Sequence, residues 1–294
     1  MKPTLRIATT RPLPDPDHDE ELLLAALRQQ GIEARMALWK DEAERWDSGE
    51  PTLIRSPWDY IHSLSPFLDW VKRVDRAGPL WNPAAVVLEN AHKRYLLELA
   101  REGLPVVPTW LIERGAAVDP AGVDLAAGLR VRGWEDIVVK PAVGAGSWST
   151  QRYTLSQIGS AQQHLAELSP AVEVLIQPYL RSVEGHGERA MVAIEGEFTH
   201  AVRKSPRFIG MEESVSEAVS LHADERELGE RVLARYPRLA YARVDVARDE
   251  RGVPMIMELE LIEPSLFLRQ NPHALERLAL GMRERLLALQ HSAR

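Results

Sequence analysis

The sequence predicts an α/β unit at the N-terminus that is joined to a larger α+β body. Strand-like and helix-like stretches alternate over residues 1–85, which is typical of a parallel sheet with helices on its faces. From residue 86 onward, short apolar strands are joined by hairpin turns and interrupted by single helices. With 294 residues, 45% of them hydrophobic and 27% charged, the chain is long enough for two or three domains with cores of their own.

The first 85 residues contain a strand, a helix and two further strands. LRIATT (5–10) is a buried strand, ELLLAALRQQG (21–31) is a helix that ends at Gly31, and EARMALW (33–39) and TLIRS (52–56) are strands. Ligands gather at the carboxyl ends of parallel strands, so polar residues near these ends are candidate contacts for a small amino-acid-like substrate. They are Arg11, Arg55, Ser56, Trp58, Asp59 and Tyr60. Turn formation or a surface ion pair is the alternative for each of them.

The remaining elements follow from apolar periodicity and from turn residues. We expect a helix within 82–103 that runs to Gly103, strands at 106–112 and 172–180, a strand that enters a Gly/Ser-rich turn over 136–150, and a helix around 155–167. A hairpin over 191–204 turns at Glu195-Gly196, a helix covers 225–236, a second hairpin covers 241–262, and an amphipathic helix closes the chain at 273–290. The predicted units are 1–85, 86–178 and 179–294.

The second hairpin carries a cluster of charges on apolar strands. If its turn centres on positions 250 and 251, position 243 lies opposite position 258, and Arg243, Asp245, Glu258 and Glu260 share one face. Like charges on a half-buried face repel each other unless a cation lies between them. Three carboxylates form an oxygen site that suits Mg²⁺ together with substrate phosphates. A charged, solvated sheet face is the alternative.

A second feature is the stretch VVKPAVGAGSWST (138–150). Lys140 ends an apolar strand, where burial is costly unless an anion pairs with the ammonium group. The Gly144-Ala145-Gly146-Ser147 turn that follows can bring backbone N–H groups to phosphate oxygens. The stretch is neither a P-loop nor a dinucleotide fingerprint, because it lacks GxxxxGK[ST] and has Ser149 in place of the third glycine. An ordinary hairpin is the alternative.

Composition and missing motifs exclude several classes of protein. A formal net charge of −7 without a dense basic block argues against a nucleic-acid binder. The chain has no cysteine, which removes disulfides, thiolate nucleophiles and cysteine-based zinc sites. It also lacks HExxH, GxSxG, EF-hand and kinase motifs. Since no signal peptide or membrane-spanning stretch is evident, we expect a cytoplasmic protein without membrane partners.

The order of the motifs resembles the ATP-grasp superfamily of carboxylate–amine ligases. The succession is NAHK, VVKPAVGAGS, VLIQPYL, GHGERAM, HAVRK, YARVD and MELELIEPS, within about residues 82–268. The chain is similar to the RimK and glutathione synthetase branch, and LIRSPWDY, NPAAVVLENAHKRYLLEL and EFTHAVRKSP resemble the ligases that form cycloserine from O-ureido-serine. Two features depart from the branch: Glu258-Leu-Glu260 replaces Glu-x-Asn, and SPRFIGMEESVSE (205–217) replaces the glycine-rich substrate loop of glutathione synthetases. The resemblance implies an ATP-grasp fold behind a Rossmann-like N-terminal domain.

The resemblance also implies roles for individual residues. ATP contacts would come from Lys93 and Lys140 at the α- and β-phosphates, from the closing loop with Gly144, Gly146 and Ser147, from Gln177, Tyr179 and Leu180 at the adenine, and from Glu184 or else Glu188 at the ribose. Asp245, Glu258 and Glu260 would hold Mg²⁺, as one or two ions with Mn²⁺ as a substitute. Arg189, Lys204 and Arg243 would face the γ-phosphate and the acyl phosphate.

The predicted function is therefore an ATP-dependent ligase for a small amino-acid-like substrate. A substrate carboxylate would become an acyl phosphate, and attack by an amine would form an amide with release of ADP and phosphate. One alternative is an intramolecular cyclo-ligase of the O-ureido-serine type, and another is a non-catalytic nucleotide-binding regulatory protein. A Rossmann-like oxidoreductase fits poorly, since no GxGxxG follows the first strand. Relatives of this kind suggest a homodimer or a homotetramer.

Overall fold

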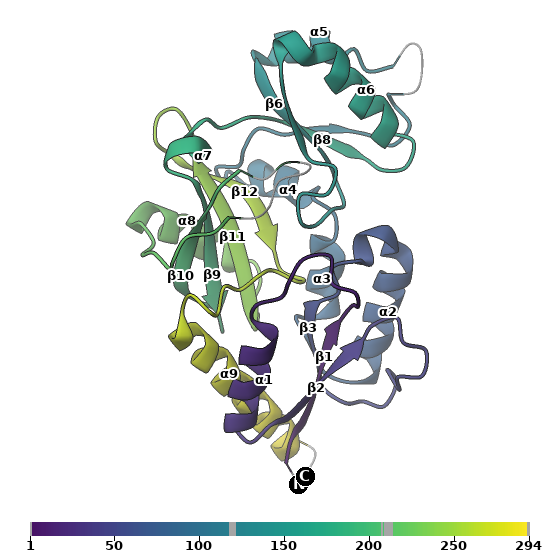
Figure 1. Ribbon diagram of the computed structural model, residues 1–294, viewed down its shortest axis with the longest axis vertical. Coiled ribbons are helices and arrows are strands. Elements are labelled where there is room, and N and C mark those ends of the chain that lie inside the picture. The colour runs from purple at the N-terminus through teal and green to yellow at the C-terminus, as the bar shows by residue number, and fades with distance from the viewer. Residues whose placement is uncertain (1, 118–121, 207, 209–213, 293–294) are drawn as a thin grey trace.

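The computed structural model describes residues 2–117, 122–206, 208 and 214–292. Within this part of the chain there are three sheets of four strands each (Figure 1). They occupy residues 4–81, 110–178 and 188–260, on either side of the predicted boundaries at 85 and 178. The boundaries themselves stay predictions. None of the described helices combines the length and the apolar character that crossing a membrane requires.

The N-terminal sheet is parallel, as predicted, with strand order β2-β1-β3-β4. Its strands are β1 (Thr4–Thr9), β2 (Glu33–Leu38), β3 (Thr52–Ser56) and β4 (Leu80–Trp81). Helix α1 (Glu20–Gln29) links β1 to β2, and η1 (Tyr60–His62) and α2 (Leu64–Ala77) precede β4. Every residue of β3 is buried, so this strand lies at the centre of the unit and its carboxyl end faces the rest of the molecule.

The helix expected within 82–103 is in fact two helices, α3 (Ala84–Asn90) and α4 (Tyr95–Arg101). The chain breaks between them because the Lys93 amide donates to the carbonyl of Ala142 (2.8 Å), beyond the end of a strand, instead of continuing the helix. The strand expected at 106–112 is shorter as well, since β5 covers only Trp110–Ile112. Pro108 cannot donate to a ladder, and Val107 bonds Ile256 instead.

The second sheet is antiparallel, with strand order β5-β8-β6-β7. It contains β6 (Asp136–Pro141), β7 (Gln151–Thr154) and β8 (Val174–Pro178) beside β5. Helices α5 (Leu125–Arg132) and α6 (Ile158–Leu168), the latter preceded by η2 (Leu155–Gln157), pack on the sheet, and Leu125, Leu129 and Leu165 share their core with its strands. This unit stands apart from the other two in Figure 1 and contacts them at its inner edge.

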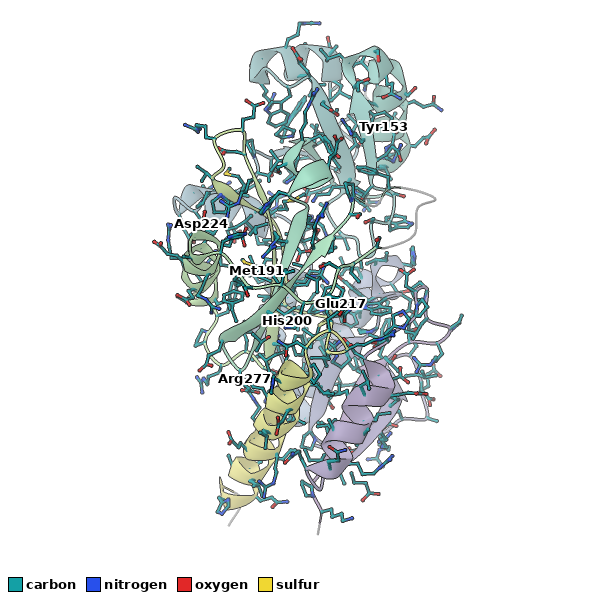
Figure 2. All side chains as sticks on the ribbon, turned by 60° about the vertical axis from the view of Figure 1, so that its left-hand side comes forward. Tyr153, Met191, His200, Glu217, Asp224 and Arg277 are labelled. Carbon is teal, nitrogen blue, oxygen red and sulfur yellow. The ribbon has the colours of Figure 1, made fainter. Side chains whose placement is uncertain are left out.

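The third sheet is antiparallel with strand order β10-β9-β11-β12. Its strands are β9 (Glu188–Ile194), β10 (Glu197–Lys204), β11 (Tyr241–Arg248) and β12 (Pro254–Glu260), and α7 (Ser182–Gly185) precedes β9. The predicted turn at Glu195-Gly196 is confirmed, with φ of 51° and 78°. Helix α8 (Ala223–Leu233) covers one face, while α9 (Pro272–Ser292) runs back along α1. Arg277 of α9, which is labelled in Figure 2, donates to the carbonyl of Ile194 at 2.9 Å.

The register of the second hairpin differs from the prediction by two positions. Arg243 lies opposite Glu260, and Asp245 lies opposite Glu258. Near the turn the pairing is Arg248 with Pro254, one residue away from the predicted alignment, and a bulge between Asp245 and Val246 adds one more. A shift of the register by one residue would have turned the glutamates away from Asp245. The second one-residue shift returns them to the same face. The four charged residues thus share one face, as predicted, but this depends on the bulge as well as on the position of the turn.

Candidate active site

A cleft of about 610 Å³ lies where the three sheets meet. Its walls come from the loop after β3, the inner ends of β6 and β8, and the face of the third sheet that carries the charged hairpin. Most of the residues singled out from the sequence line this cleft. They are Trp58, Asp59, Tyr60, Lys93, Lys140, Gly144, Gly146, Ser147, Gln177, Tyr179, Leu180, Lys204, Arg243, Glu258 and Glu260.

The remaining candidates at the carboxyl ends of β1 and β3 lie outside the cleft wall. Arg11 is exposed and pairs with Glu20. The Ser56 hydroxyl is buried against that of Thr9 at 2.8 Å. Arg55 is 2% exposed and donates to the carbonyl of Pro264 at 3.0 Å. Arg55 and Ser56 therefore support the wall from behind, as part of the packing between the N-terminal sheet and the segment that follows β12.

Arg189 lies on the opposite face of the third sheet from the cleft, which corrects the expectation that it faces the phosphates. In the β9–β11 pairing, Asp245 lies opposite Ala190 and Val246 opposite Arg189, so Arg189 points away from Asp245. Its guanidinium donates to the carbonyl of Ser220 at 2.6 Å. The neighbouring Glu188, on the other face, lines the cleft. Glu184, the preferred ribose contact, is instead an exposed partner of Arg152, although it accepts from the Tyr179 hydroxyl at 3.2 Å.

Glu258 lies between two lysines, one from the break between α3 and α4 and one from β6. Its carboxylate is 2.7 Å from the Lys93 ammonium and 4.0 Å from that of Lys140. Burial alone would raise the pKa of Glu258, but the two ammonium groups outweigh it and hold that pKa below its usual value. Burial lowers the pKa of Lys140, which lies farther from the carboxylate. The Lys93 ammonium also donates to the carbonyl of Gly144 at 2.7 Å, which ties the glycine-rich loop to this group.

Asp245 and Glu260 share Arg243. The guanidinium donates to both oxygens of Asp245, at 2.8 and 2.9 Å, and also to Glu260. Lys204 bridges Asp245 at 3.1 Å and Glu188 at 2.7 Å. Despite complete burial, Arg243 and Lys204 hold the pKa of Asp245 well below its ordinary value. Burial, with the charges of Asp245 and Glu258, raises the pKa of Glu260 to about 8.

The three carboxylates fit a magnesium ion in chemistry, because they offer only oxygen atoms from one face of two paired strands. In the arrangement described, each of them holds a cationic side chain. Within the described residues, their oxygens do not all lie within 4.8 Å of one another. A metal ion would therefore replace part of the contact to Arg243 and Lys93, and would free these cations for phosphate oxygens. The assignment of the three residues as ligands stays a prediction.

The outer edge of β12 is held by side chains instead of by another strand. The Asn90 amide donates to the Leu259 carbonyl at 2.8 Å and accepts from the Leu261 amide at 2.9 Å, while the Tyr95 hydroxyl accepts from the Leu259 amide at 3.0 Å. Farther along, the Ile256 carbonyl accepts from the Val107 amide at 3.0 Å. These bonds fix the rotation of β12, so the side chains of positions 258 and 260 are directed into the cleft.

Among the cleft residues that were not singled out from the sequence is Glu263, which follows β12. It is 9% exposed, and burial raises its pKa to about 7 even though Lys93 and Tyr60 oppose the rise. Its segment is fixed because the Trp58 indole donates to the Glu263 carbonyl at 2.9 Å and Arg243 to that of Ser265 at 3.3 Å. A third glutamate in the run ELELIE was the available signal, but position 263 lies beyond the strand, where alternation no longer predicts its direction.

The cleft also has apolar lining residues, as a flat aromatic base would require. They include Val107, Val138, Leu180, Met257 and Leu259. Gln177 lines the cleft as well, and its amide donates to the Thr109 hydroxyl at 2.9 Å.

The glycine-rich loop lies over the cleft and reaches the N-terminal unit. Gly146, Ser147 and Ser149 have positive φ, so the loop turns sharply. Trp148 meets the ring of His62 edge-on at 5.3 Å. In the stretch that replaces the substrate loop of glutathione synthetases, residues 207 and 209–213 lie outside the described residues.

Comparison with known proteins gives consistent matches. Residues 5–82 match the family model described as D-cycloserine synthetase DcsG, N-terminal domain. The chain is 34% identical over 285 residues to the cycloserine biosynthesis protein DcsG of Streptomyces lavendulae, over 92% of this chain and 94% of that protein. The crystal structure of D-cycloserine synthetase DcsG matches with a TM-score of 0.86 and 32% identity, over 96% of this chain and 99% of that one. A RimK domain ATP-grasp protein from Sphaerobacter thermophilus, at 17% identity and a TM-score of 0.66 over 95% and 98% of the two chains, shares the fold.

Proposed function

Because the chain belongs to the DcsG family of ATP-grasp ligases, we propose that it closes one small amino-acid-like molecule into a ring at the expense of ATP. The predicted ATP-grasp fold and the predicted class, an ADP-forming C–N ligase, are thereby confirmed. The substrate we propose is of the O-ureido-serine type, an amino acid whose side chain carries a nitrogen bonded to oxygen. Between the two predicted reactions, joining two molecules or closing one, the likeness to a cycloserine synthetase over nearly the whole chain favours ring closure.

The first step is phosphoryl transfer to the substrate carboxylate. Lys93 and Lys140 would leave Glu258 and hold the α- and β-phosphates, while Arg243 and Lys204 face the γ-phosphate. Mg²⁺ held by Asp245, Glu258 and Glu260 would neutralise phosphate charge and orient the transferred group. The carboxylate oxygen attacks the γ-phosphorus in line, ADP leaves, and an acyl phosphate results. The side chains supply position and charge, and no covalent protein intermediate is needed.

The second step closes the ring. The nitrogen bonded to oxygen in the same molecule attacks the acyl carbon and loses its proton, and phosphate leaves. The ring then still carries the carbamoyl group on that nitrogen, and water must hydrolyse this bond in a separate step to release the unsubstituted ring. Arg243 lies at the floor of the cleft, where its guanidinium can stabilise the oxyanion that develops in this step. Water would destroy the acyl phosphate, so the contact between Trp148 and His62 has a role in keeping the glycine-rich loop closed.

Glu263 is our candidate for the substrate ammonium group. Its carboxylate is buried in the cleft wall beside Tyr60 and forms no ion pair among the described residues, because Lys93 is committed to Glu258. Tyr60 supplies a hydrogen bond to this carboxylate but no charge. A buried carboxylate without a cationic partner is costly, and an ammonium group of the substrate would supply one. The site would thus hold an amino acid by its ammonium group at Glu263 and direct its carboxylate toward Arg243.

The proposal also includes the metal ions, the oligomeric state and the cellular location. We expect one or two Mg²⁺ ions, with Mn²⁺ as a substitute, a homodimer or homotetramer, and action in the cytoplasm, where ATP is available.

The observation that carries the proposal is the agreement between the family match and a cleft in which Lys93, Lys140, Lys204 and Arg243 converge on the carboxylates of Asp245, Glu258 and Glu260. The test is to incubate the protein with ATP, Mg²⁺ and each enantiomer of O-ureido-serine, and to follow ADP release and product mass. We expect ADP and a cyclic product from one enantiomer alone. ADP release that requires a second amine would instead show an intermolecular ligase, and no ADP release with either enantiomer would overturn the proposed substrate.

A further inference from the structure

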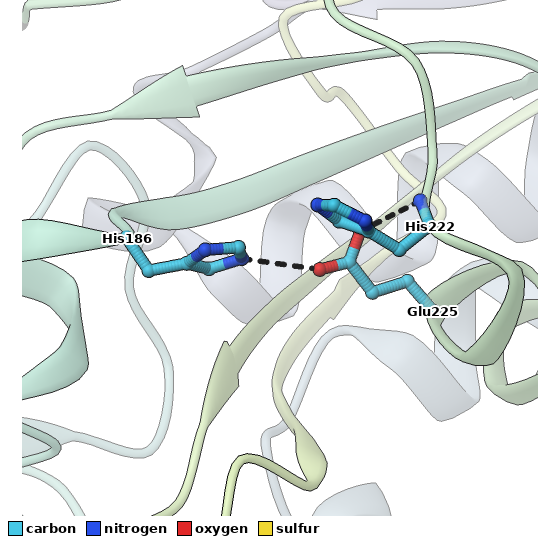
Figure 3. A group of neighbouring side chains, drawn as sticks. All are labelled: His186, His222 and Glu225. Atoms are coloured by element: carbon cyan, nitrogen blue, oxygen red, sulfur yellow. Dashed lines mark hydrogen bonds and ion pairs between the residues drawn. The ribbon is translucent and has the colours of Figure 1, made fainter.

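Two histidines and a glutamate gather outside the cleft, on the α8 side of the third sheet. His186 follows α7, His222 precedes α8, and Glu225 lies in the first turn of α8. One ligand atom from each of the three lies within 4.8 Å of the other two. Figure 3 shows that the Glu225 carboxylate faces both imidazole rings. From this arrangement we propose a binding site for a divalent transition metal, with Zn²⁺ as its representative.

The spacing of the first two ligands already suits such an ion. The Nε2 atom of His186 is 3.3 Å from Oε1 of Glu225. Two atoms that each lie about 2.0 Å from a tetrahedral zinc ion are about 3.3 Å apart, so the ion can take the place of the hydrogen bond between them. The His222 ring is tilted by 35° to that of His186, with centroids 5.6 Å apart. His222 is exposed, so rotation of this side chain completes the set. A water molecule can occupy the fourth position on the open side.

The surrounding charges decide which oxygen of Glu225 is available. Oε2 accepts from the His222 amide at 3.2 Å and lies 3.6 Å from Arg189, so it is occupied within the protein. Oε1 also meets Arg248 at 3.1 Å, but Arg248 is held more closely by Asp224, at 2.6 and 2.9 Å. Arg248 can therefore stay on Asp224 when a metal takes Oε1. The nearby arginines oppose a cation, and for this reason we expect micromolar rather than tighter affinity.

Imidazole nitrogen determines the class of metal. Zn²⁺, Co²⁺, Ni²⁺ and Cu²⁺ accept imidazole ligands readily, whereas Mg²⁺ prefers oxygen and water. The site is therefore chemically distinct from the carboxylate face of the cleft. The site is also connected to the cleft along the chain, because α7 begins shortly after the cleft residues Tyr179 and Leu180. A metal ion between His186 and α8 would tie this segment to the third sheet.

The test uses the full chain in excess Mg²⁺, which occupies the carboxylates of the cleft. Titration with Co²⁺, followed by the visible absorption of tetrahedral cobalt, and with Zn²⁺, followed by calorimetry, should give one site per chain. Loss of an outer-shell partner already weakens metal affinity by about 10–100-fold, so we expect at least tenfold weakening in His186→Ala and in His222→Ala. His273→Ala, at an exposed histidine of α9, is the matched control.

His222 is exposed, so its variant keeps the packing of the protein, and equal melting temperatures without metal would verify this. Zinc should raise the melting temperature of the wild type and of His273→Ala, but not that of His222→Ala. Equal affinity in the wild type and in both ligand variants would overturn the proposal. So would the absence of a tetrahedral cobalt spectrum in the wild type.

Discussion

Replacing Glu258 by glutamine should separate the two roles that we propose for its carboxylate, as the partner of two lysines and as a Mg²⁺ ligand. The amide keeps the shape of the side chain and removes its charge, which leaves Lys93 and Lys140 buried without their common partner. At an effective dielectric constant of about 20, the contacts at 2.7 and 4.0 Å correspond to about 6 and 4 kcal/mol before desolvation. Most of this is offset by desolvation, and breaking a buried pair typically costs about 3–5 kcal/mol. Since the Glu258 side chain is 25% exposed, we expect the substitution to lower the free energy of unfolding by about 3 kcal/mol, the lower end of this range.

For the free protein, this loss should appear as a lower melting temperature. An unfolding entropy of about 2.1 cal/mol/K per residue over the 294 residues converts 3 kcal/mol into a shift of about 5 °C. ADP without Mg²⁺ should narrow the gap between variant and wild type, because phosphate oxygens replace the missing carboxylate at the two lysines. Addition of Mg²⁺ should then raise the melting temperature of the wild type further and leave the variant unchanged, and the variant should lose ATP-dependent turnover.

Differential scanning fluorimetry with ADP, with and without Mg²⁺, measures the three changes in melting temperature, and ADP release measures turnover. Glu250→Gln is the control, because Glu250 lies exposed at the turn of the same hairpin. The reasoning is refuted if Glu258→Gln shows the same Mg²⁺-dependent increment and the same turnover as the wild type. An unchanged melting temperature of the free variant would separately show that the lysine pairs contribute nothing to stability.

Three further predictions follow from other parts of the structure. Glu263→Gln should lower kcat/KM for the amino-acid substrate by about 30-fold or more, as loss of a buried charge pair requires, with the KM for ATP unchanged; an equal change in both would contradict the ammonium role. Burial lowers the pKa of His200 to about 4 from an ordinary 6.5, so the unfolded chain binds the extra proton first as the pH falls. Stability should thus be complete above pH 6.5 and decline toward pH 4 by about 3 kcal/mol. In His200→Gln, at the position labelled in Figure 2, chemical denaturation at pH 7 and pH 5 should show a smaller difference, and an undiminished difference would exclude His200 as the cause. Trp148→Ala removes the edge contact to His62, worth about 0.5–1.5 kcal/mol, and should lower product formed per ADP released; an unchanged ratio would mean that the loop does not exclude water.

The sequence allowed the elements and the order of the site residues to be predicted, because both depend on local patterns. The parallel N-terminal strands and the turn at Glu195-Gly196 follow from apolar periodicity and from turn chemistry. The break before α4 could not be predicted in this way. It depends on one bond from the Lys93 amide to Ala142, about fifty residues away along the chain, and helix propensity contains no information on such a bond.

The directions of the site residues also depend on contacts between distant parts of the chain. Alternation along a strand divides its residues into two sets, but the pairing with neighbouring strands decides which set faces the cleft. For β12 the prediction gave the right face through a register that was wrong by two residues, because a turn offset and a bulge compensate each other. For Arg189 no such compensation exists, and it lies behind the sheet. Glu263 follows the strand, so only the tertiary contacts of its segment reveal its place.

The side chains that hold the outer edge of β12 have a consequence for engineering. Because Asn90 and Tyr95 fix the strand at Leu259 and Leu261, the end of the hairpin that lines the cleft does not depend on its distant turn for alignment. The turn at residues 249–252 is therefore a suitable place to insert a fluorescent reporter or to open the chain for circular permutation. A short flexible insert there should leave ATP-dependent turnover within about twofold of the uninterrupted protein, whereas the same insert after Asn90 should abolish it.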